Sequence, residues 1–186
     1  MSFRSTSLTM LFACAGFLSL AFPGNSADKT TAADVRLAEV RRAAPDFVGI
    51  NNWLNSDALN IADLRGKVVL VDFWTYGCVN CVNTLPYVTK LYETYKDKGF
   101  VVVGIHTPEF PFEKSAGNVQ AAIKRHAIRY PVAQDNNYAT WKAYQNRYWP
   151  AQYIVDRTGN IVFEHAGEGQ YGQIEQIVRK LLNTSS

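Results

Sequence analysis

The chain has 186 residues, of which 47% are hydrophobic and 19% are charged. This composition is typical of an ordinary globular protein, and the length indicates one domain with a short extension. The formal net charge is only +3, with the basic residues spread along the sequence, so we expect no nucleic-acid partner.

The N-terminus has the pattern of a secretory signal peptide. Arg4 is the only charged residue before Asp28, and residues 8–22 are almost all apolar or small. This run is shorter than the roughly 20 residues that span a bilayer. We therefore expect a signal peptide over 1–27 and export to the periplasm. An uncleaved membrane anchor and a lipoprotein signal ending at Cys14 are the less favoured alternatives.

Residues 28–44 predict a flexible or helical leader, and 45–186 predict the folded domain. Short extended segments over 46–54 predict an N-terminal β-hairpin. Val68–Trp74 is an apolar run with Asp72 as its only polar residue, which is typical of a central strand covered on both faces.

A helix pattern and a second buried strand follow the first strand. The helix pattern ends at Gly99, and Phe100–Ile105 is again apolar. Strand, helix and strand in this order predict a βαβ unit with parallel strands, and therefore an α/β fold. Later elements are expected as a helix over 115–126, a strand over 130–134, a helix over 138–147, a hairpin over 151–165 and a helix over 173–182.

Cys78 and Cys81 are separated by two residues at the predicted start of the helix. Unpaired N–H groups and the helix dipole favour an anion at that end, and hence a thiolate at Cys78. Cys81 lies about one turn further along and is expected to be more buried. The spacing predicts a redox-active disulfide Cys78–Cys81, in which Cys78 attacks and Cys81 resolves the mixed disulfide.

Other uses of this cysteine spacing fit the chain less well. A zinc half-site needs four ligands, whereas the mature chain has no further cysteine and its three histidines show no ligand spacing. We therefore expect no metal. An inert structural disulfide closing so small a loop stabilises little by entropy.

Three features together resemble thioredoxin. The sequence Val71-Asp-Phe-Trp74 precedes Cys-x-x-Cys, Pro86 follows the second cysteine by five residues, and Pro150 precedes the predicted hairpin. The resemblance implies a three-layer α/β/α fold with a mixed sheet. It also implies that Pro150 is cis and faces the cysteines, with Trp149 presenting backbone groups to substrate. Tyr76 and Gly77 are further expected substrate-binding residues.

The chain is more similar to the exported TlpA/ResA group, which adds an N-terminal hairpin and a helix and strand after the βαβ unit. The motifs resemble most closely the thioredoxin-like domain of DipZ-type proteins, which is joined to a membrane electron carrier. They are Phe73–Tyr76, Cys78–Cys81, Thr84–Pro86, His106–Phe110 and Tyr148–Gln152. The resemblance implies an exported thiol–disulfide oxidoreductase that exchanges with protein thiols and disulfides. It further implies a membrane electron-carrier partner, no cofactor and a monomer.

The chain departs from thioredoxin around the cysteines. Gly77 replaces a tryptophan, and Val79-Asn80 replaces Gly-Pro. Cytochrome-maturation proteins of the ResA type carry a glutamate where this chain has Thr84. A dedicated role in cytochrome c maturation is therefore not expected, and the direction of electron flow stays open, with a preference for a reductant by resemblance alone.

Asp72 is a candidate catalytic residue, because burial in an apolar strand should raise its carboxyl pKa. It is expected to accept a proton from Cys81 as a general base. The alternative for Asp72 is a hydrogen-bonded structural residue. For Tyr76 and Trp149 the alternative is core packing. His106 and Glu109 are more typical of loop or capping residues.

Two rival functions remain open. Thr75-Tyr-Gly-Cys78 resembles the active-site motif of a peroxiredoxin-like peroxidase, but Val71 stands where that family has proline. The second rival is a non-enzymatic module in which the two cysteines bind copper(I), a soft metal that suits thiolates.

Overall fold

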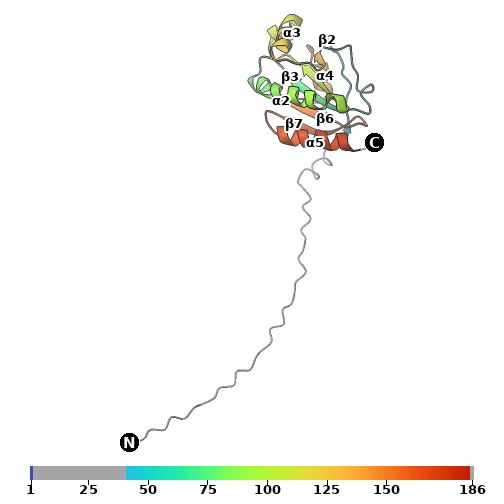
Figure 1. Cartoon of the computed structure of the whole chain (residues 1–186). Helices are drawn as coiled ribbons and strands as arrows, with labels where there is room; N and C mark the ends of the chain where they lie inside the picture. The colour runs from blue at the N-terminus through green and yellow to red at the C-terminus, as the bar shows by residue number, and fades with distance from the viewer. Residues whose placement is uncertain (2–40, 185–186) are drawn as a thin grey trace. The chain divides into compact units, whose positions relative to one another are not determined.

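The computed structural model describes Met1 and residues 41–184 (Figure 1). The expected signal peptide and most of the expected leader lie outside the described residues. Among those described, no helix is both long and apolar enough to cross a membrane.

A mixed sheet forms the centre of the described domain, with strand order β1-β7-β6-β3-β4-β5-β2. β3 pairs in parallel with β4 and antiparallel with β6. The strands are β1 (Arg42–Ala43), β2 (Asn52–Leu54), β3 (Val68–Trp74), β4 (Phe100–His106), β5 (Val132–Gln134), β6 (Ala151–Val155) and β7 (Asn160–Ala166). All seven residues of β3 are buried, as its apolar sequence predicted.

Helices cover both faces of this sheet. One face packs against α2 (Val79–Tyr95), α3 (Ala116–Arg125) and α5 (Tyr171–Asn183), and α2 and α5 lie side by side in Figure 1. The other face packs against the short helix α4 (Ala139–Ala143) and apolar residues of the segment 47–64. The expected α/β/α layering and mixed sheet are therefore confirmed, as is the additional helix and strand after the βαβ unit.

The expected N-terminal β-hairpin was wrong. β1 pairs with β7 at one edge of the sheet, whereas β2 pairs with β5 at the other. The segment between them carries Phe47 into the core, where its ring lies 5.8 Å from that of Trp53. Because burying this apolar side chain is favourable, the segment crosses the sheet instead of turning back. The sheet also includes Arg42–Ala43, so the fold begins before the expected boundary at residue 45.

The expected helix over 138–147 is shorter, because it ends at Ala143. Gln145 has a φ of +55°, which is incompatible with continuing a right-handed helix. The Asn146 side chain instead contacts the sheet, where its Oδ1 accepts a hydrogen bond from the hydroxyl of Tyr153 at 3.1 Å.

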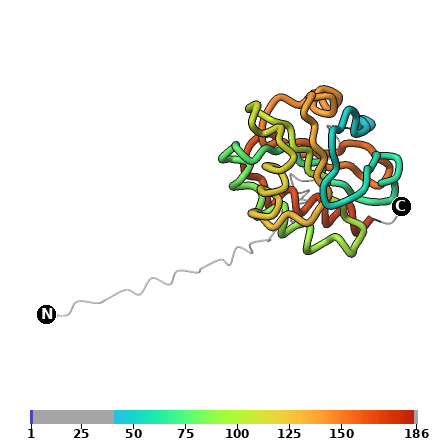
Figure 2. Tube along the Cα trace, turned by 90° about the horizontal axis from the view of Figure 1, so that it is seen from above, coloured from blue at the N-terminus to red at the C-terminus, as the bar shows by residue number. Residues whose placement is uncertain are grey.

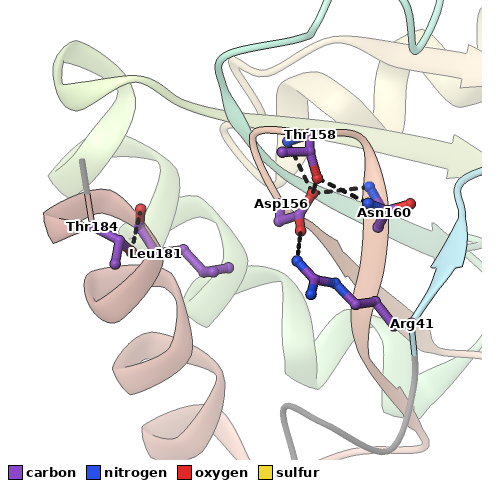
Figure 3. A network of polar contacts seen from close by, with 6 residues as sticks. All are labelled: Arg41, Asp156, Thr158, Asn160, Leu181 and Thr184. Atoms are coloured by element: carbon purple, nitrogen blue, oxygen red, sulfur yellow. Dashed lines mark hydrogen bonds and ion pairs between the residues drawn. The ribbon is translucent and has the colours of Figure 1, made fainter. Parts of the chain in front are cut away.

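The turn between β6 and β7 is held by Asp156. Its Oδ1 accepts hydrogen bonds from the backbone N–H groups of Thr158 and Asn160, both at 2.9 Å, and its Oδ2 lies 3.6 Å from Arg41 (Figure 3). An aspartate bonding to backbone N–H groups further along is a common way to build a tight turn. The turn fixes the register of the hairpin that begins directly after Pro150.

Arg157, in the same turn, ties the hairpin to two other segments. Its guanidinium donates to the carbonyl oxygens of Gly66 at 2.8 Å and Leu182 at 3.0 Å, and the Gly66 N–H donates to the Arg157 carbonyl at 2.9 Å. Figure 2 shows the segment around residue 66 beside the hairpin. These contacts hold β3, which leads to the cysteines, in place relative to β6.

Candidate active site

The two cysteines lie at the N-terminus of α2, at the end of β3. Cys78 is the N-cap residue with an extended backbone and is half-buried, whereas Cys81 is 1% exposed. The Cys81 N–H donates to the Sγ of Cys78 at 3.2 Å, and both thiols are free in this structure. A helix N-terminus stabilises negative charge. The site therefore presents one accessible sulfur with a second, covered sulfur behind it.

The environment of Cys81 strongly disfavours ionisation of its thiol. Burial raises its pKa, and the hydrogen bond with Cys78 and the nearby charge of Asp72 raise it further. A thiol in this environment becomes a nucleophile only when a base removes its proton.

Asp72 lies on β3 and is 1% exposed. Burial raises the pKa of its carboxyl to about 7, although a hydrogen bond from Gln152 opposes part of that shift. The bond joins the Nε2 of Gln152 to the Oδ1 of Asp72 at 3.1 Å. A carboxyl group that titrates near neutrality beside a buried thiol is suited to act as a general base.

The sequence reasoning did not assign a role to Gln152. Gln152 is 2% exposed and lies opposite Asp72 in the β3–β6 pairing. A glutamine within the otherwise apolar strand Ala151–Val155 is the only sequence signal that pointed to it. Its partner becomes evident only from the strand register.

His106 packs against the residues that precede Cys78. It ends β4, is fully buried, and its Nε2 lies 3.3 Å from the hydroxyl oxygen of Thr75. The ring of Tyr76 stacks on the imidazole with centroids 5.5 Å apart. Burial lowers the pKa of His106 to about 4, partly offset by the charge of Glu113. His106 is therefore neutral at pH 7 and packs the turn that precedes Cys78.

Glu113 is a buried carboxyl group that the sequence reasoning missed. It lies in a short 3₁₀ turn and is fully buried. Its Oε1 accepts a hydrogen bond from the N–H of Gly77 at 2.9 Å, and its Oε2 accepts from the N–H groups of Glu109 at 2.6 Å and Phe110 at 3.0 Å. No local pattern marks a glutamate among exposed phenylalanines as buried, so no sequence signal identified it.

Trp149, which lines the same groove as Cys78, is followed by Pro150. The bond between them is cis, as the resemblance implied. Trp149 is half-buried, its indole N–H donates to the carbonyl of Thr107 at 3.0 Å, and its ring lies 4.2 Å from that of Trp141. Trp149 therefore packs against the core with one side while the other remains available.

A groove of about 390 Å³ opens at Cys78. It is lined by Gly77, Cys78, Val79, Asn80, Glu109, Phe110 and Trp149. Of the four expected substrate-binding residues, Gly77 and Trp149 line this groove. Tyr76 instead stacks on His106, and Pro150 is buried. Cys81 bonds to Cys78 through its N–H group, and Asp72 lies close enough to Cys81 for its charge to raise the pKa of that thiol.

Comparison with known proteins agrees with this arrangement. The family model for Redoxin matches residues 39–181. The chain belongs to the Redoxin family. It is 51% identical over 143 residues to protein DipZ of Mycobacterium tuberculosis, a match that covers 75% of this chain and 21% of DipZ. The chain thus spans about a fifth of the length of that relative.

Two further matches cover almost the whole of the other protein. The thiol-disulfide oxidoreductase YkuV of Bacillus subtilis is 28% identical, with 77% of this Redoxin-family chain and 97% of YkuV covered. A solution structure of a thioredoxin-like protein in the oxidised form superimposes with a TM-score of 0.72 at 28% identity, covering 80% of this chain and 99% of that one. The family predicted by resemblance is confirmed: this member of the Redoxin family is a thioredoxin-like protein of the TlpA/ResA type, related to DipZ.

Proposed function

We propose that this Redoxin-family protein is a thiol–disulfide oxidoreductase whose substrates are protein thiols and disulfides. The observation that carries the proposal is the layered arrangement at the start of α2. Cys78 faces the groove, Cys81 is covered behind it, and Asp72, with a pKa near 7, lies beneath. Each group has the environment that one step of disulfide exchange requires.

In the reducing direction, the Cys78 thiolate attacks one sulfur of a substrate disulfide. A Cys78–substrate disulfide forms, the substrate S–S bond breaks, and the departing thiolate takes a proton from water. Cys81 then gives its proton to Asp72 and attacks the Sγ of Cys78. The second substrate thiolate leaves, so the substrate gains two electrons and the protein holds the Cys78–Cys81 disulfide. Oxidation of a dithiol substrate follows the same steps in reverse.

The test is to trap the mixed disulfide. With Cys81→Ser, the intermediate at Cys78 is not resolved, and disulfide-linked partner proteins should accumulate. The matched control, Cys78→Ser, should capture none because Cys81 is buried. Failure of reduced Cys78 to exchange with any disulfide would remove the proposal. Peroxide consumption or copper binding by the reduced protein would instead favour the peroxidase or the copper-binding alternative.

We also propose that the protein is exported to the periplasm and exchanges electrons with a membrane carrier, working as a reductant. The signal-like pattern of residues 1–27 and the resemblance to DipZ-type proteins support these points. N-terminal sequencing of the protein from the periplasmic fraction tests export, since a mature chain beginning near residue 28 is expected. The redox potential of the Cys78–Cys81 couple tests the direction, because a reductant needs a potential towards the negative end of the family range.

A further inference from the structure

The loop between β4 and α3, residues 107–115, packs against the turn that leads to Cys78. The hydroxyl of Tyr76 donates to the carbonyl of Phe112 at 3.0 Å, and the N–H of Gly77 donates to Glu113 at 2.9 Å. The turn preceding the nucleophile is thus bonded to a segment that lies 36 residues away in sequence.

The two segments form two walls of the groove at Cys78. Gly77 and Cys78, in the turn before α2, form one wall of the groove. Glu109 and Phe110, in the loop 107–115, form the other. The carboxyl group of Glu113 bonds to both. One oxygen accepts from Gly77, and the other accepts from Glu109 and Phe110. A single buried side chain therefore joins the backbones of both walls.

The contact at Gly77 is close. A Cβ atom built on Gly77 would lie 2.2 Å from the Oε1 of Glu113, so no larger residue fits without displacing the carboxyl group. Both oxygens of Glu113 act as acceptors, which a carboxylate provides and an amide does not. Hydrogen bonds from N–H groups to a carboxylate are shorter and stronger than neutral ones. The site is therefore built for a glutamate at this position.

We propose that Glu113 is a positioning residue that sets the separation between Cys78 and the wall formed by Glu109 and Phe110, and so determines how a peptide flanking the substrate cysteine is held. This rests on the proposed thiol–disulfide exchange. A peptide disulfide contacts both walls, whereas a small disulfide needs only Cys78. Loss of the link should therefore affect the two kinds of substrate differently.

The experiment compares Glu113→Gln with the wild type on two substrates. One is a disulfide-bonded peptide with an apolar residue beside its cysteine, and the other is bis(2-hydroxyethyl) disulfide. The glutamine amide would place its N–H donors against the backbone N–H donors of one wall, so one of the two links would be lost. The kcat/KM for the peptide should therefore fall roughly 10- to 100-fold, mainly through KM. The rate with the small disulfide should stay within about two-fold of the wild type, since the cysteines are untouched. Glu164→Gln, an exposed carboxylate on β7, is the matched control and should change neither rate.

Phe110→Ala provides a second variant that should fold, because this side chain is 46% exposed. It removes part of one wall and should give the same selective loss on the peptide. Equal losses on both substrates, or a wild-type KM for the peptide in both variants, would overturn the positioning role. A wild-type protein that reduces neither disulfide would instead refute the thiol–disulfide exchange on which the role depends.

Discussion

The Nε2 of Gln152 donates a hydrogen bond to the Oδ1 of Asp72 at 3.1 Å, inside the sheet and across the β3–β6 pairing. This bond favours the ionised carboxylate, whereas burial favours the protonated acid. The balance leaves the pKa of Asp72 at about 7, where the group can both accept and release a proton. In the proposed mechanism Asp72 accepts the proton of Cys81, so we expect the rate of resolution to depend on this pKa.

Asp72→Asn should slow resolution by Cys81 about 100-fold at neutral pH, because the variant has no group to accept the thiol proton. The measurement is release of a peptide from the Cys78 mixed disulfide as a function of pH. Wild-type release should rise as pH passes 7, when Asp72 becomes ionised, and the variant should lack that rise. An unchanged rate would leave Asp72 with a structural role only.

Asp72 should also make stability depend on pH. Its pKa is raised from 3.8 to about 7 in the folded protein, so the folded state binds more protons than the unfolded chain between those values. The stability from the neutral carboxyl is complete below about pH 4 and is lost as pH rises to about 7. At 1.36 kcal/mol per pH unit, the loss is roughly 4 kcal/mol.

Denaturant unfolding of the reduced wild type and of Asp72→Asn measures this loss. The free energy of unfolding of the wild type should fall relative to that of the variant between about pH 4 and pH 7. Above pH 7 the two free energies should change with pH in parallel. A difference that does not change with pH would show that Asp72 titrates normally.

Gln152→Leu should raise the pKa of Asp72 further, since the variant loses the one hydrogen bond that favours the carboxylate. A hydrogen bond to a charged group contributes about 1.5–3 kcal/mol, which corresponds to roughly one to two pH units. An NMR titration of the Asp72 carboxyl carbon checks the value. Gln134 is another buried glutamine and lies on β5. The control variant Gln134→Leu should leave the pKa of Asp72 unchanged.

Gly77→Ala should destabilise the protein by about 1–3 kcal/mol, as overpacking of a filled site commonly does. The added methyl group would meet the Glu113 carboxyl at 2.2 Å. Gly172→Ala is the matched control, since that position in α5 has nothing within 4 Å of an added Cβ. There the substitution should be neutral or stabilising, because alanine favours helix more than glycine does. Thermal unfolding of both variants gives the comparison, and equal effects would contradict the close packing at Gly77.

Local patterns in the sequence predicted the elements that carry the cysteines. The apolar run of β3, the spacing of Cys78 and Cys81 and the periodicity of α2 are each properties of neighbouring residues, and each predicted its structure from backbone geometry and burial alone. The predicted helix over 138–147 extends too far at its C-terminal end, because Asn146 makes a tertiary contact that local helix propensity does not reflect.

Neighbouring residues alone were therefore enough to predict the cysteine pair and the strand and helix that present it. The groups around that pair come from distant parts of the chain. Gln152 forms a hydrogen bond with Asp72, which lies 80 residues away in sequence, and Glu113 forms one with Gly77, 36 residues away. β1 and β2 go to opposite edges of the sheet, although they are close in sequence. Such contacts depend on strand register and on how loops pack over a finished core, and no short stretch of residues specifies either.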